Sequence, residues 1–111
     1  MTELNTETIQ SKNMLKEAFK ELGRYSKNQC RVFDALVDIS VDNITYFSIN
    51  NMSKKINVTR PTIYNTLKTF QKDGILSEEG KIGTYKFQQE TLDLIINFYK
   101  KQQESAKCKK L

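Results

Sequence analysis

Apolar residues recur at three- and four-residue steps in several stretches of the chain, which is the pattern of amphipathic helices. The first stretch, residues 6–24, has lysines and glutamates opposite its apolar face and ends at Gly23. The second runs from Ser26, a suitable N-cap, to about Ile39. The apolar positions are Ile9, Leu15, Phe19 and Leu22 in the first stretch and Cys30, Phe33, Leu36 and Val37 in the second.

The next segment predicts a short strand followed by a two-turn helix. Asp-Asn at residues 42–43 breaks the helical rhythm, and the strand-favouring residues behind it are too few for a long strand. Ser48 is a suitable N-cap, and Asn57 suits the left-handed conformation that often closes a helix. The apolar positions are Ile44, Tyr46 and Phe47 in the strand and Ile49, Met52 and Ile56 in the helix.

Signals for a longer helix converge from Thr59 onward. Thr59 offers a capping hydroxyl, Pro61 stands in the first turn where its missing N–H costs nothing, and Gly74 marks the end. The helical period assigns three apolar residues to the inward face: Ile63, Leu67 and Phe70.

The last third of the chain predicts a β-hairpin and a final helix. Ile75 and Leu76 return to the core, "SEEGKIG" has turn chemistry with two glycines, and "TYKFQ" alternates apolar and polar residues. From about Glu90 an amphipathic helix follows, and its end, "KCKKL", is expected to fray. The apolar stripe of this helix is Leu92, Ile95, Ile96 and Tyr99.

Composition limits the classes of protein to consider. The 111 residues are 38% hydrophobic and 28% charged, with four Gly and one Pro, which suits one compact, helix-rich core. No apolar run approaches the roughly 18 residues that span a bilayer, and the N-terminus is too polar for a signal peptide. We therefore expect a cytoplasmic protein with no membrane partner.

Candidate catalytic and metal-binding residues are scarce. Cys30 and Cys108 lie far apart and the chain contains no histidine, so neither a zinc site nor a CxxC redox motif can be assembled. A tyrosine such as Tyr64 could attack a phosphate only with an electrophilic and basic set of partners, which a chain with three arginines and no histidine lacks. We expect no enzymatic activity, no cofactor and no metal.

The net charge of +5 is concentrated in the middle of the sequence. No acidic residue occurs between Asp42 and Asp73. A basic window without acids is the electrostatic footprint of a protein that binds a polyanion, although exposed lysines are also common as plain solvated groups. The basic residues of this window are Lys54, Lys55, Arg60, Lys68 and Lys72.

The stretch "SINNMSKKINVTRPTIYNTLKTFQKDGILSEEGKIGTYKF" combines a two-turn helix, a tight turn, a longer helix and a hairpin. It resembles the winged helix-turn-helix of DNA-binding proteins of bacteria and mobile elements. With a long helix after the wing, the architecture is also similar to replication terminator proteins and PadR-like repressors. The resemblance implies a mainly α fold with a small β-hairpin wing: a winged helix-turn-helix over residues 27–88, flanked by extra helices at 1–26 and 89–111.

The helix that begins near Thr59 carries the candidate DNA-binding residues. In the family that the chain resembles, this helix enters the major groove. Arg60 and Asn65 are candidates to read bases, because arginine pairs well with guanine O6/N7 and asparagine with adenine N6/N7. Thr62 projects from the same first turn. The residues expected to meet phosphates are Lys54, Lys55, Thr59, Lys68 and Lys72.

Two further candidates leave alternatives open. Tyr64 either packs against the preceding helix or offers its hydroxyl to a phosphate. Lys81 lies at the hairpin tip, where a wing approaches DNA, yet Glu78 and Glu79 beside it would be repelled by phosphate.

The stripe of the last helix suggests a homodimer, in which Leu92, Ile95, Ile96 and Tyr99 pair across a two-fold axis. The alternative is that both flanking helices cover the chain's own core.

The sequence predicts a dimeric, sequence-specific transcription regulator that binds double-stranded DNA, with half-sites about 10 base pairs apart. The alternative is a plasmid or mobile-element replication or maintenance factor that binds an origin or single-stranded DNA. For this alternative Tyr46, Tyr64 or Tyr85 should be exposed beside the basic residues, since single-strand binding stacks bases on aromatic rings. A third alternative is a winged helix that contacts only proteins.

Overall fold

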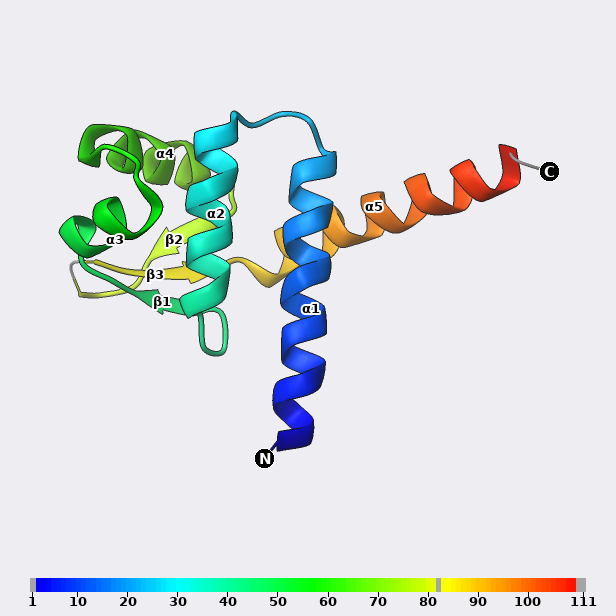
Figure 1. Cartoon of the computed structure of the whole chain (residues 1–111), viewed down its shortest axis with the longest axis horizontal. Helices are drawn as coiled ribbons and strands as arrows, with labels where there is room; N and C mark the ends of the chain where they lie inside the picture. Colours follow the sequence, from blue (N-terminus) through cyan, green and yellow to red (C-terminus); the bar gives the residue numbers. More distant parts are fainter. Residues whose placement is uncertain (1, 82, 110–111) are drawn as a thin grey trace.

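A computed structural model of the chain describes residues 2–81 and 83–109, with side chains for residues 11–81 and 83–104. The described residues form five helices and a small antiparallel sheet of three strands (Figure 1), which confirms the expectation of a mainly helical fold. The elements are α1 (Thr2–Glu21), α2 (Lys27–Ile39), β1 (Ile44–Tyr46), α3 (Ile49–Ile56), α4 (Arg60–Lys72), β2 (Leu76–Glu78), β3 (Thr84–Phe87) and α5 (Gln89–Lys109).

Local signals set most of the helix ends. Ser26 caps α2 with a full capping box, in which its hydroxyl accepts from the Gln29 N–H and the Gln29 side chain accepts from the Ser26 N–H. Ser48 caps α3 through the N–H of Asn51. Asn57 closes α3 in the left-handed conformation, with φ of 56°. These ends confirm the assignments made from the pattern.

The two ends of α4 differ in how well the sequence predicts them. At the C-terminal end, Gly74 adopts φ of 77°, and the N–H groups of Gly74 and Ile75 donate to the carbonyls of Gln71 and Phe70. This pair of bonds is a Schellman motif, which uses the glycine as expected. At the N-terminal end, the predicted capping hydroxyl of Thr59 makes no bond to the helix backbone.

The three strands form a sheet in the order β1-β3-β2, with both pairs antiparallel. β2 and β3 are the predicted hairpin, and β1 adds a third strand to its other edge by pairing Thr45 with Tyr85. Thr45 is fully buried, and its hydroxyl donates to the carbonyl of Tyr85. The sheet therefore joins the segment before α3 to the segment after α4. These two connections fix both ends of the α3–α4 pair.

An aromatic cluster forms the centre of the core. The rings of Phe19, Phe33 and Phe70 come from three different helices and contact one another, while Phe87 at the end of β3 packs against Phe33. All four rings are at most 1% exposed. Because Phe19 belongs to α1, the N-terminal helix is part of the same core as α4, and the burial of these rings stabilises both together.

The apolar stripe of α5 packs inside the chain. Leu92 and Ile95 are 4% and 7% exposed, and Ile96 and Tyr99 are partly buried against the core cluster. Figure 1 shows the first part of α5 crossing behind α1, with its later turns extending away from the body. Leu92 and Ile95 are therefore buried where a dimer interface was predicted, because α1 already covers that side of α5. A homodimer stays a prediction that this stripe does not support.

Candidate nucleic-acid interface

Helix α4 is anchored by one side and exposed on the other. Its buried side comprises Ile63, Thr66, Leu67 and Phe70. Thr66, which the pattern did not place in the core, satisfies its hydroxyl by donating to the Thr62 carbonyl at 2.7 Å. The opposite side is open to solvent, as the helical period predicted. Its exposed residues are Arg60, Pro61, Tyr64, Asn65, Lys68 and Lys72.

The first turn of α4 leaves backbone donors unused. The hydroxyls of Thr59 and Thr62 hydrogen-bond each other at 2.8 Å, so the Thr59 hydroxyl does not cap the helix. The first N–H groups of a helix have no partner within the helix and carry partial positive charge. Without a side-chain cap, these donors are free to bind an anion from outside, while the exposed hydroxyl of Thr59 lies beside them.

Arg60 is held by a residue that the sequence did not single out. Its Nη1 donates to Oδ1 of Asn50 in the first turn of α3, at 3.0 Å. Both side chains are exposed, and a guanidinium has five N–H donors, so this one bond leaves most of the fork unused. Asn50 restricts the directions that Arg60 samples before any ligand arrives.

Two hydrogen bonds between Ser53 and Val58, one donated by each residue, fix the turn between α3 and α4. The Ser53 hydroxyl donates to the Val58 carbonyl at 2.7 Å, and the Val58 N–H donates to the Ser53 carbonyl at 3.3 Å. Val58 is 4% exposed and anchors the turn in the core. With Asn57 left-handed, these contacts set the angle between the two helices. The role of Ser53 was not predicted.

A cleft of about 600 Å³ lies where the first turns of α3 and α4 meet the hairpin. Gly83 closes the hairpin side of this cleft in a conformation that glycine favours, with φ of 83°, and an added Cβ would stand 3.0 Å from the Phe47 carbonyl oxygen. The cleft combines a guanidinium, an amide and aromatic rings. Its lining includes Phe47, Asn50, Arg60, Pro61, Tyr64 and Gly83.

The tyrosines near the basic residues differ in exposure. Tyr46 is 72% and Tyr64 52% exposed, so about half of Tyr64 is open to solvent. Tyr85 is partly buried and stacks on Phe47, with 5.8 Å between ring centroids. Burial, with smaller effects of Glu78 and Tyr64, raises the pKa of Tyr85. Two of the three tyrosines thus present rings to solvent.

The remaining predicted cations are exposed and spread over two elements. Lys54 and Lys55 stand in the last turn of α3, and Lys81 stands at the hairpin tip. At the tip, the exposed carboxylates of Glu78 and Glu79 outnumber the single ammonium. The hairpin is therefore a weak partner for phosphate, and Lys81 stays an unsupported candidate.

The acidic groups nearest to α4 in the chain are bound at its far end. Asp73, the C-cap, accepts from the Tyr25 hydroxyl at 2.7 Å. Glu78 accepts from Gln71 at 3.3 Å. Asp73 and Glu78 both lie beyond the last turn of α4. The first three turns of its exposed side, from Arg60 to Lys68, therefore carry no acidic group.

Other kinds of site find little support. Among residues 11–81 and 83–104, whose side chains are described, no group of three or more His, Cys, Asp or Glu could hold a metal. None of the described helices is long and apolar enough to cross a membrane. The Cys30 thiol is half-buried, and burial, followed by the charge of Asp34, raises its pKa. A raised pKa disfavours the reactive thiolate. Comparisons with protein-family models, with curated proteins and with solved structures find no significant match for this chain.

Proposed function

We propose that this chain binds double-stranded DNA as a winged helix-turn-helix protein, with α4 in the major groove and α3 supporting it. The observation that carries the proposal is the exposed side of α4, which is basic and free of acids while its opposite side is anchored in the core. A helix of 13 residues is about 20 Å long, and the major groove of about 12 Å in width admits one helix.

The exposed residues of α4 divide into two roles. Arg60 and Asn65 point from the first two turns, where a recognition helix meets base edges. Arg60 has two N–H donors for guanine O6 and N7, and Asn65 has a donor and an acceptor for adenine N7 and N6. Asn50 acts as a positioning residue for Arg60 through their 3.0 Å hydrogen bond. Because the guanidinium is partly ordered in the free protein, less side-chain entropy is lost on binding.

Phosphate contacts come from groups around this centre. The uncapped N–H donors of α4 and the Thr59 hydroxyl offer directed hydrogen bonds, while lysines supply charge. The hydroxyls of Thr59 and Thr62 share one hydrogen bond, and Thr62 contributes less than expected because it is half-buried whereas Thr59 is exposed. The lysines proposed for phosphate are Lys54, Lys55, Lys68 and Lys72.

A regulator that occludes a promoter is the function that this interface fits most directly, because the proposed contacts include groups able to read sequence. A dimer would place two copies of α4 on half-sites about one helical turn apart. The stripe of α5 is buried against α1, so such a dimer would need a surface other than Leu92 and Ile95.

A second candidate is a replication or maintenance factor that binds single-stranded DNA. The exposed rings of Tyr46 and Tyr64 favour it, because unpaired bases stack on aromatic side chains beside basic groups. The Tyr64 ring also lines the cleft next to Arg60. Fluorescence anisotropy with matched single-stranded and duplex oligonucleotides distinguishes the two candidates, since the major-groove proposal requires tighter binding to the duplex.

Binding-site selection from a random duplex library tests sequence recognition. We expect Arg60→Ala to weaken binding to the selected duplex by about 1 to 3 kcal/mol while leaving binding to random duplex nearly unchanged. Arg31→Ala, on the exposed side of α2, removes the same charge and is the matched control. Equal losses on selected and random DNA would remove Arg60 from base reading, and no binding to either duplex would refute the proposed function.

A further inference from the structure

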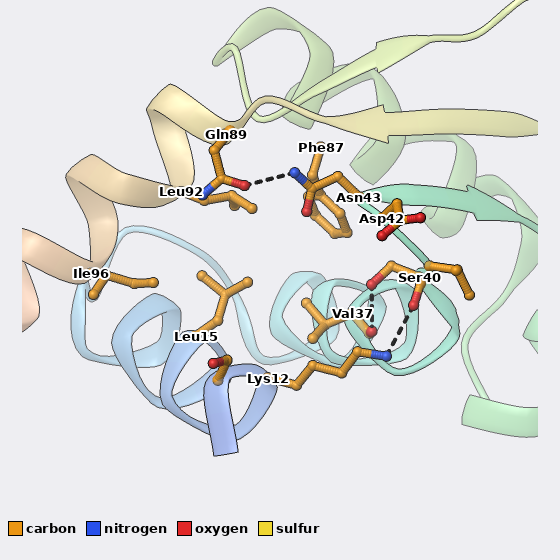
Figure 2. Close-up of a pocket in the computed structure, with 12 residues that line it drawn as sticks. Lys12, Leu15, Val37, Ser40, Asp42, Asn43, Phe87, Gln89, Leu92 and Ile96 are labelled. Carbon is orange, nitrogen blue, oxygen red and sulfur yellow. Dashed lines mark hydrogen bonds between the residues drawn. The ribbon is translucent and has the colours of Figure 1, made fainter. Parts of the chain in front are cut away.

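A second cavity, of about 580 Å³, is lined by the residues drawn in Figure 2. It is bounded by α1, by the end of α2 with the turn that follows it, and by the first turns of α5. Its volume falls within the range of pockets that hold small molecules. None of the residues proposed for DNA binding lines it.

The cavity has an apolar end and a polar end. Figure 2 shows Leu15, Leu92 and Ile96 together on one side, with the polar groups of Lys12, Ser40 and Asp42 at the other. Leu15 and Leu92 are 8% and 4% exposed, so these side chains belong to the packed core and form the apolar wall of the cavity. A molecule that fits this division has an apolar body and a polar head.

The ammonium of Lys12 is fixed at the polar end. It donates to the carbonyls of Asp38 and Ser40 at 3.2 and 3.0 Å, at the C-terminal end of α2. These are its only acceptors among the described residues, and an ammonium has three N–H groups. With respect to the residues whose side chains are described, one donor remains for an acceptor on a bound molecule.

Asp42 places the opposite charge at the same end. Its side chain is exposed, and no described residue donates a hydrogen bond to its carboxylate or forms an ion pair with it. Asn43, the next residue, instead ties the turn to α5, because its Nδ2 donates to Gln89 Oε1 at 2.7 Å. The Gln89 amide is used further by donating to Asp93 at 2.8 Å. These hydrogen bonds fix the edge of the cavity. Among the described residues, an N–H group of Lys12 and the carboxylate of Asp42 have no hydrogen-bond partner.

We propose that this cavity binds a small zwitterion with an apolar body, the chemistry of an α-amino acid with a branched aliphatic or aromatic side chain. A ligand with only a carboxylate would satisfy Lys12 but face the charge of Asp42, and a ligand with only an ammonium would do the reverse. A zwitterion satisfies both groups, and its apolar side chain covers the Leu15, Leu92 and Ile96 wall. This site does not depend on DNA binding.

Titration of the ¹⁵N-labelled full chain with L-leucine and L-phenylalanine, followed by amide chemical shifts, tests the proposal. We expect saturable shifts at residues 40–43 and 89. The single-charge analogues of leucine, 4-methylpentanoate and 3-methylbutylamine, should bind about tenfold or more weakly than leucine, because each loses a charge-assisted hydrogen bond. L-Serine, which lacks the apolar body, should not saturate in the same range.

Two variants separate the charges. Lys12→Gln and Asp42→Asn should each weaken the binding of leucine or phenylalanine about tenfold or more. Asparagine tolerates the left-handed conformation that Asp42 adopts at φ of 53°, and the same spectra report whether each variant is folded. Lys20→Gln, exposed on α1 outside the cavity, is the matched control and should bind as the wild type does.

Four results would overturn the proposal or a part of it. The first is an absence of saturable shifts with both amino acids at millimolar concentration, and the second is saturable shifts confined to α3 and α4. The third is binding of either single-charge analogue as tight as that of leucine, which would refute the zwitterionic head. Unchanged affinity in a folded Lys12→Gln variant would likewise refute the assigned role of the ammonium.

Discussion

Lys68 offers a quantitative test of the phosphate contacts. It stands in the middle of the exposed side of α4, and four exposed lysines are proposed to meet phosphates. Each neutralised phosphate contributes about −0.9 to the slope of log K against log salt on duplex DNA, so four contacts give a slope of about −3.6. Raising the salt from about 50 to about 200 mM should then weaken binding about 150-fold.

Replacing Lys68 with Gln removes one contact and keeps a long polar side chain. The expected slope becomes about −2.7, so the same increase in salt weakens binding only about 40-fold. The loss of affinity should be nearly the same on every duplex sequence, because phosphates carry no sequence information.

The assay is fluorescence anisotropy with a labelled random duplex over a series of salt concentrations. Lys100→Gln removes one positive charge from an exposed position on α5, a different helix, and serves as the control, whose slope should match the wild type. A wild-type slope near zero would refute the phosphate contacts as a group. An unchanged slope for Lys68→Gln, with the wild type as expected, would refute the contact of Lys68 alone.

Two further predictions concern stability. Tyr25→Phe removes the hydrogen bond to Asp73 but keeps the ring. Chemical denaturation should therefore show a free energy of unfolding that is lower by about 1 kcal/mol. Burial, followed by the Asp73 hydrogen bond, raises the pKa of Tyr25 from 10.0 to about 12, which favours the neutral phenol in the folded state. The contribution of Tyr25 to stability is complete below pH 10.0 and is lost as the pH rises through about 12. The variant should lack this decline. Identical profiles of the free energy of unfolding against pH would contradict the coupling. Leu92→Ala should lower the free energy of unfolding by about 2 to 5 kcal/mol without changing the mass measured by light scattering, whereas a dimer that dissociates in the variant would restore the stripe as an interface.

Features that depend on neighbouring residues could be predicted from the sequence. The left-handed Asn57 and the Schellman motif at Gly74 each follow from a residue type at the end of a periodic stretch. The inward face of α4 follows from the helical period, since Ile63, Leu67 and Phe70 leave only one side of the helix for the core.

Features that depend on contacts between residues far apart in the sequence could not be predicted. The apolar stripe of α5 shows that something covers it, but the pattern does not say whether the cover is α1 or a second chain. Asn50 looks like an ordinary surface amide until the turn brings it to Arg60, ten residues later. The pairing of β1 with β3 joins residues about forty positions apart, which no local pattern specifies.

The Thr59 cap failed for a different reason. A threonine before a proline-containing first turn has the features of an N-cap, yet its hydroxyl pairs with that of Thr62 three residues later. Side-chain hydroxyls compete for the same donors and acceptors, and the sequence does not show which bond is preferred. The result leaves the start of α4 more open to an anion than a capped helix would be.

The most direct test of the central claim is a map of the surface that DNA contacts. The ¹⁵N-labelled chain is titrated at low salt with a duplex of about two helical turns, and amide shifts are followed residue by residue. The account predicts that the largest shifts fall at residues 50–55 and 59–72, with α1 and the far end of α5 little changed. Shifts concentrated on α1 or α5, or no shifts at low salt, would contradict it.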